Sequence, residues 1–257
     1  MIYIAFLIFT LLILLFVFYQ WQYFMIFSPT YIKERTLEDT CELLSIKTDD
    51  GVELEGVVCE PLNAVNTLLV FVGRSHDAVA LIGKLSLTYP KVRIVAFNYR
   101  GYGKSGGLVN EKNILNDGIK IAQLVQKHYG DFYLLGFSLG SSVAAFVASK
   151  ERAKTLFLIG AFDSIASLSK EKFPNLCCLT KLHRYKFPTL KYMKSVNIET
   201  YLFVSKDDET VYIKNARELK EGIKNLVDYV ELEGLSHKEI LWDENVTNKI
   251  NKVISNG

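Results

Sequence analysis

The sequence lacks a strong net charge, and this excludes one broad class of partner. Its 257 residues carry 30 Lys and Arg against 28 Asp and Glu, a formal net charge of +2. Nucleic-acid-binding domains instead gather basic residues on one face. We therefore expect no nucleic-acid partner. The length fits one α/β domain with a short appendage.

Cysteine is scarce, and its spacing does not suggest a metal site. The four cysteines, Cys41, Cys59, Cys177 and Cys178, form no C-x-x-C pair. We interpret all four as small apolar side chains or free thiols, in preference to a disulfide or a metal role. We expect neither a metal nor a cofactor.

Charged side chains are absent before Lys33, and across residues 2–19 the only non-apolar residue is Thr10. At 1.5 Å per residue, a helix over residues 2–19 would be about 27 Å long, close to the ~30 Å of bilayer hydrocarbon. Aromatic residues within positions 20–24 suit the membrane interface. A signal peptide would show a basic start and a small-residue cleavage site. We therefore predict a membrane anchor over residues 1–27.

The charges beyond the anchor favour one orientation. Lys33 and Arg35 follow it, whereas the amino-terminal side carries no Lys or Arg. This bias places the remainder of the chain in the cytoplasm, and unpaired cysteines are compatible with that reducing side. We predict a single-pass membrane protein with its folded domain on the cytoplasmic side.

Strand-like and helical patterns alternate after a linker at residues 28–40. Strand-like runs lie at residues 41–48, 52–59, 67–72, 92–97, 132–135, 155–159, 201–205 and 227–232. Helical patterns lie at residues 78–87, 111–128, 141–149, 211–224 and 238–254. This alternation predicts an α/β fold, with a mainly parallel sheet covered by helices on both faces and an antiparallel hairpin at its start.

The stretch FYLLGFSLGSSVAAFVAS, residues 132–149, joins a strand to a helix by a sharp turn. It contains G-x-S-x-G with Ser138 at its centre, and strand, turn and helix are the context that this motif needs. Gly136 and Gly140 let strand and helix pass closely. The N–H of Leu139 would point from the helix N-terminus toward a negative charge forming beside Ser138. Ser138 is thus the candidate nucleophile.

A serine nucleophile needs a base, and the sequence has four histidines. Groups that serve one site gather at the carboxyl ends of parallel strands. His237 follows the last strand by a short loop and is our candidate base. His76 lies beside the expected oxyanion loop, His128 ends a helix, and His183 lies in a basic insertion.

The acid that orients this base should follow a strand between Ser138 and His237. Residues 206–209 read Lys-Asp-Asp-Glu after the strand at 201–205. Composition does not choose among these acids, and Asp163 after the preceding strand is a further candidate.

Four blocks, NYRGYGKSGG (98–107), GFSLGS (136–141), SKDDETV (205–211) and GLSHKE (234–239), resemble those of a known family. The chain resembles α/β-hydrolase-fold serine hydrolases of the compact, membrane-associated branch that includes the eukaryotic protein depalmitoylases and their bacterial relatives. In that family the acid is the third residue after the glycine of a G-x-x-D-x-x-V pattern. Ser205 occupies the glycine position, so the resemblance implies Asp208 as the acid, Ser138 as the nucleophile and His237 as the base.

Besides Ser205, two departures from the family bear on the site. His-Gly-Asn usually follows the strand that builds the oxyanion hole, whereas this chain has Val72-Gly73-Arg74. The backbone N–H of Arg74 can still donate, so Arg74 and Leu139 are the expected oxyanion donors. Asn98 replaces the usual Asp before Y-R-G-Y-G, a segment to which we assign no catalytic role.

The sequence therefore predicts an α/β-hydrolase domain over residues 41–257, with a short cap inserted at about 161–197. The domain would cleave carboxylic ester or thioester bonds through an acyl-enzyme on Ser138, with lipids and acylated proteins as candidate substrates. Two alternatives stay open. A serine peptidase of the prolyl-oligopeptidase-like type shares the constellation, and a non-catalytic membrane scaffold would need a broken triad.

The predicted cap is basic, with one acid, Glu171, among its charged side chains after residue 164. Its cations are Lys170, Lys172, Lys181, Arg184, Lys186, Lys191 and Lys194. Each cation near an anionic membrane contributes about 1 kcal/mol, so several together can orient a domain. We expect either a cap lying against an anionic membrane surface or an ordinary solvated cap that lines the acyl pocket.

Overall fold

The computed structural model describes residues 2–35, 37–175 and 182–257. The strands within these ranges are β1 (Cys41–Lys47), β2 (Glu53–Cys59), β3 (Thr67–Phe71), β4 (Arg93–Phe97), β5 (Phe132–Phe137), β6 (Thr155–Ile159), β7 (Glu199–Ser205) and β8 (Leu226–Leu232). The helices are α1 (Ile2–Ile26), α2 (Ala78–Thr88), α3 (Glu111–Tyr129), α4 (Leu139–Ala148), α5 (Ile165–Lys172), α6 (Thr189–Met193), α7 (Ile213–Lys220), the short 3₁₀ helix η2 (Ile240–Trp242) and α8 (Glu244–Asn256).

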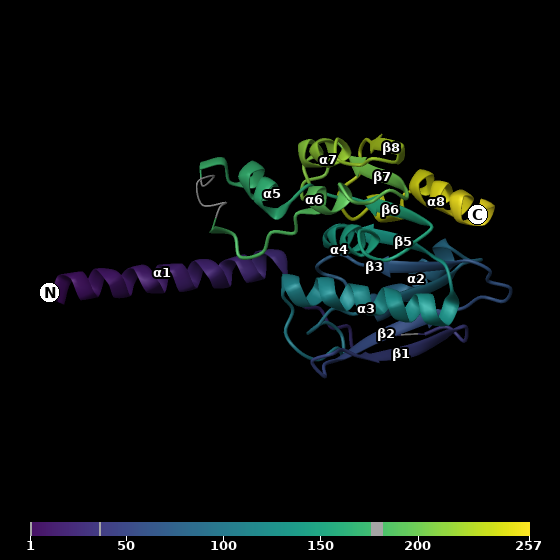
Figure 1. Ribbon diagram of the computed structural model, residues 1–257, viewed down its shortest axis with the longest axis horizontal. Coiled ribbons are helices and arrows are strands. Elements are labelled where there is room, and N and C mark those ends of the chain that lie inside the picture. Colours follow the sequence, from purple (N-terminus) through teal and green to yellow (C-terminus); the bar gives the residue numbers. More distant parts are fainter. Residues whose placement is uncertain (1, 36, 176–181) are drawn as a thin grey trace.

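The strands form one sheet in the order β1-β2-β4-β3-β5-β6-β7-β8 (Figure 1). Strand β2 is antiparallel to both of its neighbours, β1 and β4. All pairs from β4 to β8 are parallel. The central strands β3, β5 and β6 are buried along their whole length, as a sheet covered on both faces requires. The predicted mainly parallel sheet with an antiparallel hairpin at its start is confirmed.

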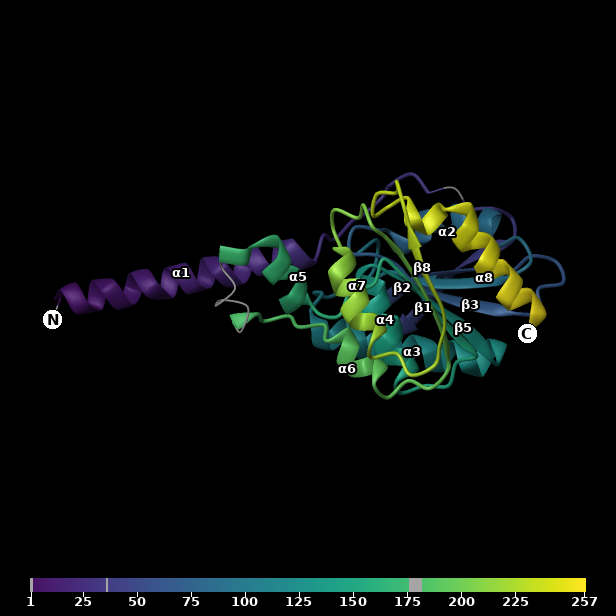
Figure 2. The same ribbon diagram turned by 90° about the horizontal axis from the view of Figure 1, so that it is seen from above.

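Helices cover both faces of the sheet (Figure 2). Helices α2 and α8 lie together on one face, where the Asn251 amide donates to the Thr88 carbonyl at 3.0 Å. Helices α3, α4, α6 and α7 lie on the other face. Helix α4 is the most deeply placed of these, because its small residues Ala144 and Ala145 have no exposed surface. This arrangement holds the start of α4 firmly against the carboxyl end of β5.

Helix α1 projects away from the domain and is exposed along most of its length (Figure 1). Its 25 residues meet the length and hydropathy of a helix that crosses a bilayer. Its last turns are different, because Gln22 and Ile26 are buried against the domain, as is the following Phe27. The apolar helix therefore leads directly into the folded domain.

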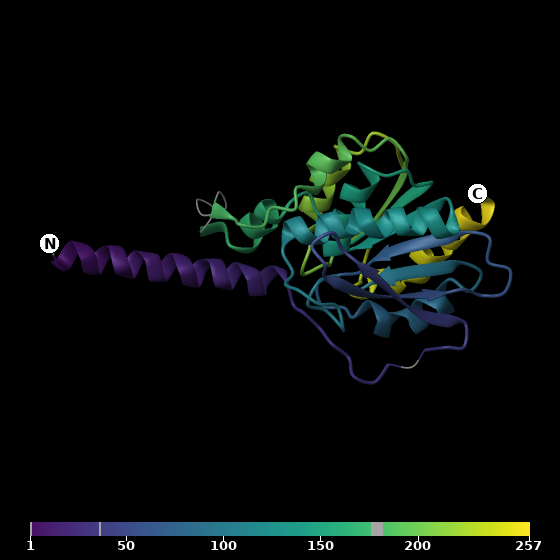
Figure 3. The same ribbon diagram turned by 60° about the horizontal axis from the view of Figure 1, so that its bottom comes forward.

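Residues 28–35 of the predicted linker are bound to the domain surface, at the lower edge of Figure 3. The backbone N–H of Ile32 donates to the Asp77 carboxylate at 3.1 Å, and the Thr30 carbonyl accepts from Gly103 at 2.9 Å. The Arg35 guanidinium lies 2.6 Å from both the Asp77 and Glu55 carboxylates. These contacts fix the path of the chain between α1 and β1.

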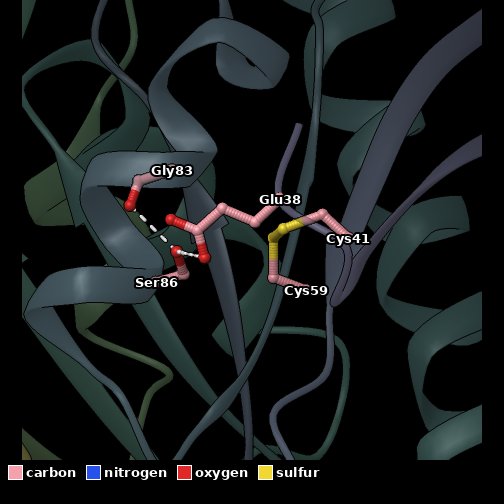
Figure 4. Close-up of a disulfide and its surroundings, with 5 residues drawn as sticks. All are labelled: Glu38, Cys41, Cys59, Gly83 and Ser86. Atoms are coloured by element: carbon pink, nitrogen blue, oxygen red, sulfur yellow. Dashed lines mark hydrogen bonds between the residues drawn. A yellow bond between two sulfur atoms is a disulfide. The ribbon is translucent and has the colours of Figure 1, made fainter. Parts of the chain in front are cut away.

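Cys41 and Cys59 form a disulfide (Figure 4), so our prediction that these two cysteines are unpaired is wrong. The antiparallel register of β1 and β2 places Cys41 opposite Cys59, with their Cα atoms 4.0 Å apart. Cys177 and Cys178, also predicted as free thiols, lie outside the described residues. Because disulfides persist mainly in oxidising compartments, the cysteines no longer support a cytoplasmic domain.

We expect replacement of both Cys41 and Cys59 by Ser to lower the free energy of unfolding by about 3 kcal/mol. The cross-link joins positions 18 residues apart and restricts the unfolded chain, and loops of similar length give an effect of this size. Denaturant unfolding of the full chain in detergent measures the change. Reduction should destabilise the unmodified protein equally and leave the double variant unaffected. Full maleimide labelling of both thiols in the denatured, unreduced protein would contradict the disulfide.

Candidate active site

Ser138 lies in a strained turn between β5 and α4. Its φ is 54°, a left-handed conformation that few non-glycine residues adopt. A Cβ on Gly136 would come within 2.5 Å of the Gly140 carbonyl oxygen, and one on Gly140 would come equally close to the Phe71 carbonyl carbon. Only glycine fits at either position. Helix α4 lies so close to β5 and β3 that the two glycines of the G-x-S-x-G motif cannot be replaced without a steric clash.

The structure brings Ser138, His237 and Asp208 together at the carboxyl ends of β5, β8 and β7. The Nε2 atom of His237 lies 2.8 Å from Ser138 Oγ, and its Nδ1 atom lies 2.6 Å from Asp208 Oδ2. All three residues are buried. The imidazole lies on the Phe137 ring at 5.0 Å, and a Cβ on Gly160 would come within 2.9 Å of its Cε1 atom. Packing on both sides therefore fixes the orientation of the imidazole.

Among the candidate acids, the structure places Asp208 against the imidazole. Its Oδ1 atom accepts the backbone N–H groups of Thr210 at 2.8 Å and Val211 at 2.7 Å, which leaves Oδ2 directed at His237. The Asp207 carboxylate instead accepts from the Gly234 N–H at 2.7 Å. Glu209 accepts the backbone N–H of His237 at 3.3 Å.

The fourth candidate acid, Asp163, belongs to a separate polar cluster. Its carboxylate accepts from Asn215 at 3.0 Å and from the Ser164 hydroxyl at 3.1 Å. Burial raises the pKa of Asp163, and these hydrogen bonds oppose the rise. Asp163 directly precedes Ser164, the residue whose side chain caps α5.

Two other histidines lie near the site without joining this chain of hydrogen bonds. His76 packs against the Phe137 ring at 5.6 Å, and burial, followed by the charges of Lys238 and His237, lowers its pKa. His183 lies at the wall of the adjacent cavity, where burial lowers its pKa. His237 is the histidine whose ring contacts Ser138.

Ser205 ties the acid loop to the histidine loop. Its hydroxyl donates to the Leu235 carbonyl at 2.6 Å and accepts from the Asp207 N–H at 3.1 Å. The Asp207–Gly234 hydrogen bond is a second tie between the same loops. A glycine at position 205 could not make the hydrogen bond to the Leu235 carbonyl. Serine, in place of the family's glycine, therefore helps to hold the two loops together.

Two tyrosines of the segment NYRGYG hold the loop that carries Arg74. The Tyr99 hydroxyl donates to the Val72 carbonyl at 2.7 Å, and the Tyr102 hydroxyl donates to the Arg74 carbonyl at 2.7 Å. Burial raises the pKa of both tyrosines, which keeps the hydroxyls protonated as donors. The segment, to which the sequence assigns no catalytic role, therefore holds this loop in position.

A buried ionic network fixes the far end of the same loop. Asp77 caps α2 by accepting the N–H groups of Val79 and Ala80. The Asn98 amide donates to Asp77 and to Glu55, each at 3.0 Å, and Arg35 binds both of these carboxylates. A carboxylate at position 98 would repel the other two, which explains why asparagine stands there. The role of Arg35 gave no signal in the sequence because its partners are distant along the chain.

A cavity of about 120 Å³ adjoins Ser138. Leu139 and Arg74, the expected oxyanion donors, line it beside the serine. The remaining lining comes mainly from the end of α1 and from α5 and the residue after it: Trp21, Gln22, Met25, Ile26, Ile165, Leu168, Ser169, Lys172 and Phe173. Among the described residues, no group of three or more His, Cys, Asp or Glu side chains is placed to hold a metal ion.

Topology and site together define an α/β-hydrolase fold. The solved structure of an esterase from Pyrococcus furiosus matches it with a TM-score of 0.70, covering 90% of this chain and 99% of that one at 17% identity. No family model matches the sequence.

Two proteins of known sequence are similar over most of the chain. An uncharacterized membrane protein of Saccharomyces cerevisiae is 29% identical over 190 residues, 70% of this chain and 67% of that protein. Alpha/beta hydrolase domain-containing protein 17B of Homo sapiens is 23% identical over 216 residues, 79% of this chain and 71% of that protein.

We expect Arg35→Ala to lower the free energy of unfolding by about 3–5 kcal/mol, because it leaves two nearly buried carboxylates, Glu55 and Asp77, without their cation. Lys33→Ala is the matched control, since Lys33 is exposed on the same segment and should change stability by no more than about 0.5 kcal/mol. Denaturant unfolding measures both. Equal, small effects of the two substitutions would show that the network does not hold the segment.

Proposed function

We propose that this protein is a membrane-anchored serine hydrolase that cleaves carboxylic ester or thioester bonds. The observation that carries the proposal is the continuous chain of hydrogen-bond distances from Ser138 through His237 to Asp208. A serine hydroxyl is a weak nucleophile unless a base accepts its proton and a third group orients that base. The intact chain argues against a non-catalytic scaffold, and the esterase-like fold supports hydrolysis.

The geometry suits acyl transfer in two steps. Ser138 Oγ attacks the acyl carbon while His237 Nε2 takes its proton, and Asp208 holds the imidazole by accepting the Nδ1–H. The same proton then passes to the departing alcohol or thiol, which leaves the acyl group on Ser138. Water, activated by the neutral imidazole, attacks the acyl-enzyme, and Ser138 recovers its proton as the acid product leaves.

The backbone N–H groups of Leu139 and Arg74 would hold the oxyanion in both steps. Leu139 is the first residue of α4, where the helix dipole also favours negative charge. Loss of one such donor typically raises a barrier by about 3 kcal/mol. Tyr99 and Tyr102 would act as positioning residues, because they hold the carbonyl groups on either side of the Gly73–Arg74 turn.

The membrane placement is part of the proposal. Helix α1 has the length and hydropathy of a span, and the resemblance to depalmitoylase-like hydrolases favours acylated proteins or lipids as substrates. A cytoplasmic domain remains a prediction that now depends on Lys33 and Arg35 alone, because the Cys41–Cys59 disulfide favours an oxidising side. The basic cap lying on anionic lipid likewise remains a prediction.

We expect Ser138→Ala to abolish covalent labelling of the full chain by a fluorophosphonate probe, because the probe reacts with an activated serine. Ser141→Ala is the matched control: Ser141 follows by one helical turn, and its hydroxyl donates to the Ser138 carbonyl. The control should label. Retained labelling of Ser138→Ala would identify a different nucleophile.

We expect Asp208→Asn to lower kcat on a p-nitrophenyl ester by on the order of 10³ or more, since an amide cannot hold the imidazole in the reactive tautomer. Asp207→Asn is the matched substitution at the next residue. Its amide oxygen can still accept the Gly234 N–H, so kcat should fall less than about tenfold. A larger loss at Asp207 than at Asp208 would overturn the assignment of the acid.

A further inference from the structure

The end of helix α1 forms part of the wall of the cavity beside Ser138. Trp21, Gln22, Met25 and Ile26 line the cavity from α1. These positions follow directly after the exposed apolar stretch that would lie in the membrane. The same helix therefore serves as the anchor and borders the candidate active site.

Helix α1 is held in this position by polar contacts. The Gln22 side chain is buried, and its amide oxygen accepts the Arg184 N–H at 2.8 Å. The Arg74 guanidinium donates to the Met25 carbonyl near the helix end. Arg74 thus connects the end of α1 to the loop of the expected oxyanion donor. A membrane span attached only as a tether would not need these contacts.

Helix α5 also lines the cavity. Figures 1 and 2 both show α5 beside α1, displaced from the main body of the domain toward the anchor. The Trp21 and Phe173 rings meet at 5.6 Å between the two helices. Leu168 and Ile165 line the cavity from α5. The cavity is therefore bordered by the end of α1, the part that would leave the bilayer.

The cavity suits hydrocarbon. Its volume of about 120 Å³ is similar to that of an engineered apolar cavity of about 150 Å³ that stays dry and binds benzene. Nine of its sixteen lining residues are aliphatic or aromatic, and the polar ones are Gln22, Arg74, Ser138, Ser169, Lys172, His183 and Thr210. A space of this size holds only the first part of a long acyl chain, so the rest of such a chain needs a path outside the cavity.

We propose that α1 is a component of the acyl-binding site, and that the acyl chain of a membrane-resident ester or thioester reaches Ser138 between α1 and α5. The inference rests on the proposed function and names its substrate class: long acyl chains that remain in the bilayer. The chain passes from lipid to an apolar cavity without exposure to water, which is the unfavourable step for hydrocarbon. The reactive carbonyl is then held at the membrane surface.

The test measures kcat/KM of the full chain in phospholipid nanodiscs for two substrates, the hexadecanoyl and the acetyl p-nitrophenyl ester. Met25→Trp and Leu168→Trp fill the cavity from α1 and from α5 respectively. Each should lower the ratio of kcat/KM for hexadecanoyl to that for acetyl ester at least tenfold. Leu14→Trp is the matched control on α1, because Leu14 is exposed and lies outside the cavity lining, and its ratio should change less than twofold.

A photoreactive probe locates the chain directly. A fluorophosphonate whose alkyl chain carries a diazirine near its sixth carbon should react with Ser138 and then cross-link to residues 21–26 or 165–173. Cross-links confined to other segments would overturn the inference, as would unchanged ratios in both Trp variants. In either case, continued labelling of Ser138 would leave the proposed function intact, whereas a failure of labelling in the unmodified protein would reject that function itself.

Two substrate sources share this chemistry and are compared in the same nanodiscs. One arm uses a hexadecanoyl glycerol ester, and the other uses a membrane-inserted peptide with an S-hexadecanoyl cysteine. If the unmodified protein and Leu14→Trp hydrolyse one of these substrates and Met25→Trp does not, the inference is supported and the source is identified. Hydrolysis of neither, in a preparation that cleaves the acetyl ester, would contradict it.

Discussion

The close passage of α4 by β3 and β5 is the constraint on which the site depends. It leaves no room for a Cβ at Gly136 or Gly140 and forces Ser138 into a left-handed backbone conformation. The strain is sustained because α4 is buried over most of its length and the packing around it holds it in place. With the serine fixed at the helix N-terminus, its hydroxyl meets the imidazole and its neighbour Leu139 presents an N–H to the same space.

The acid and the base are positioned by a second set of contacts that does not depend on the turn at Ser138. Ser205, Asp207 and Asp208 each bond to the loop after β8, at Leu235, Gly234 and His237. The parallel pairing of β7 with β8 brings these loops to one edge of the sheet. Because three hydrogen bonds hold the two loops together, the His237–Asp208 geometry is largely formed before any substrate binds.

The features that local sequence could predict are those encoded within a few residues or by strand order. The turn at Ser138, the position of His237 after the last strand and the hairpin at the start all belong to this group. The choice of Asp208 over Asp207 came from a family pattern, and the structure explains it by the N–H groups of Thr210 and Val211.

Other features depend on pairings that no short stretch of sequence shows. The hairpin of β1 and β2 is predicted, yet only its register places Cys41 opposite Cys59. Arg35 lies in a polar stretch that reads as a linker, yet its two carboxylate partners come from β2 and the loop before α2. The contribution of α1 to the cavity is of the same kind, because an apolar run signals a span without showing what its end contacts.

The central claim, that Ser138 carries the acyl group during turnover, is tested most directly by trapping the intermediate. The full chain, mixed rapidly with a p-nitrophenyl ester and quenched in acid, should carry one acyl group on the peptide that contains Ser138. The burst of p-nitrophenol should equal the amount of active enzyme. A burst with the acyl group on another residue, or multiple turnovers with no acylated peptide at any time, would contradict the account.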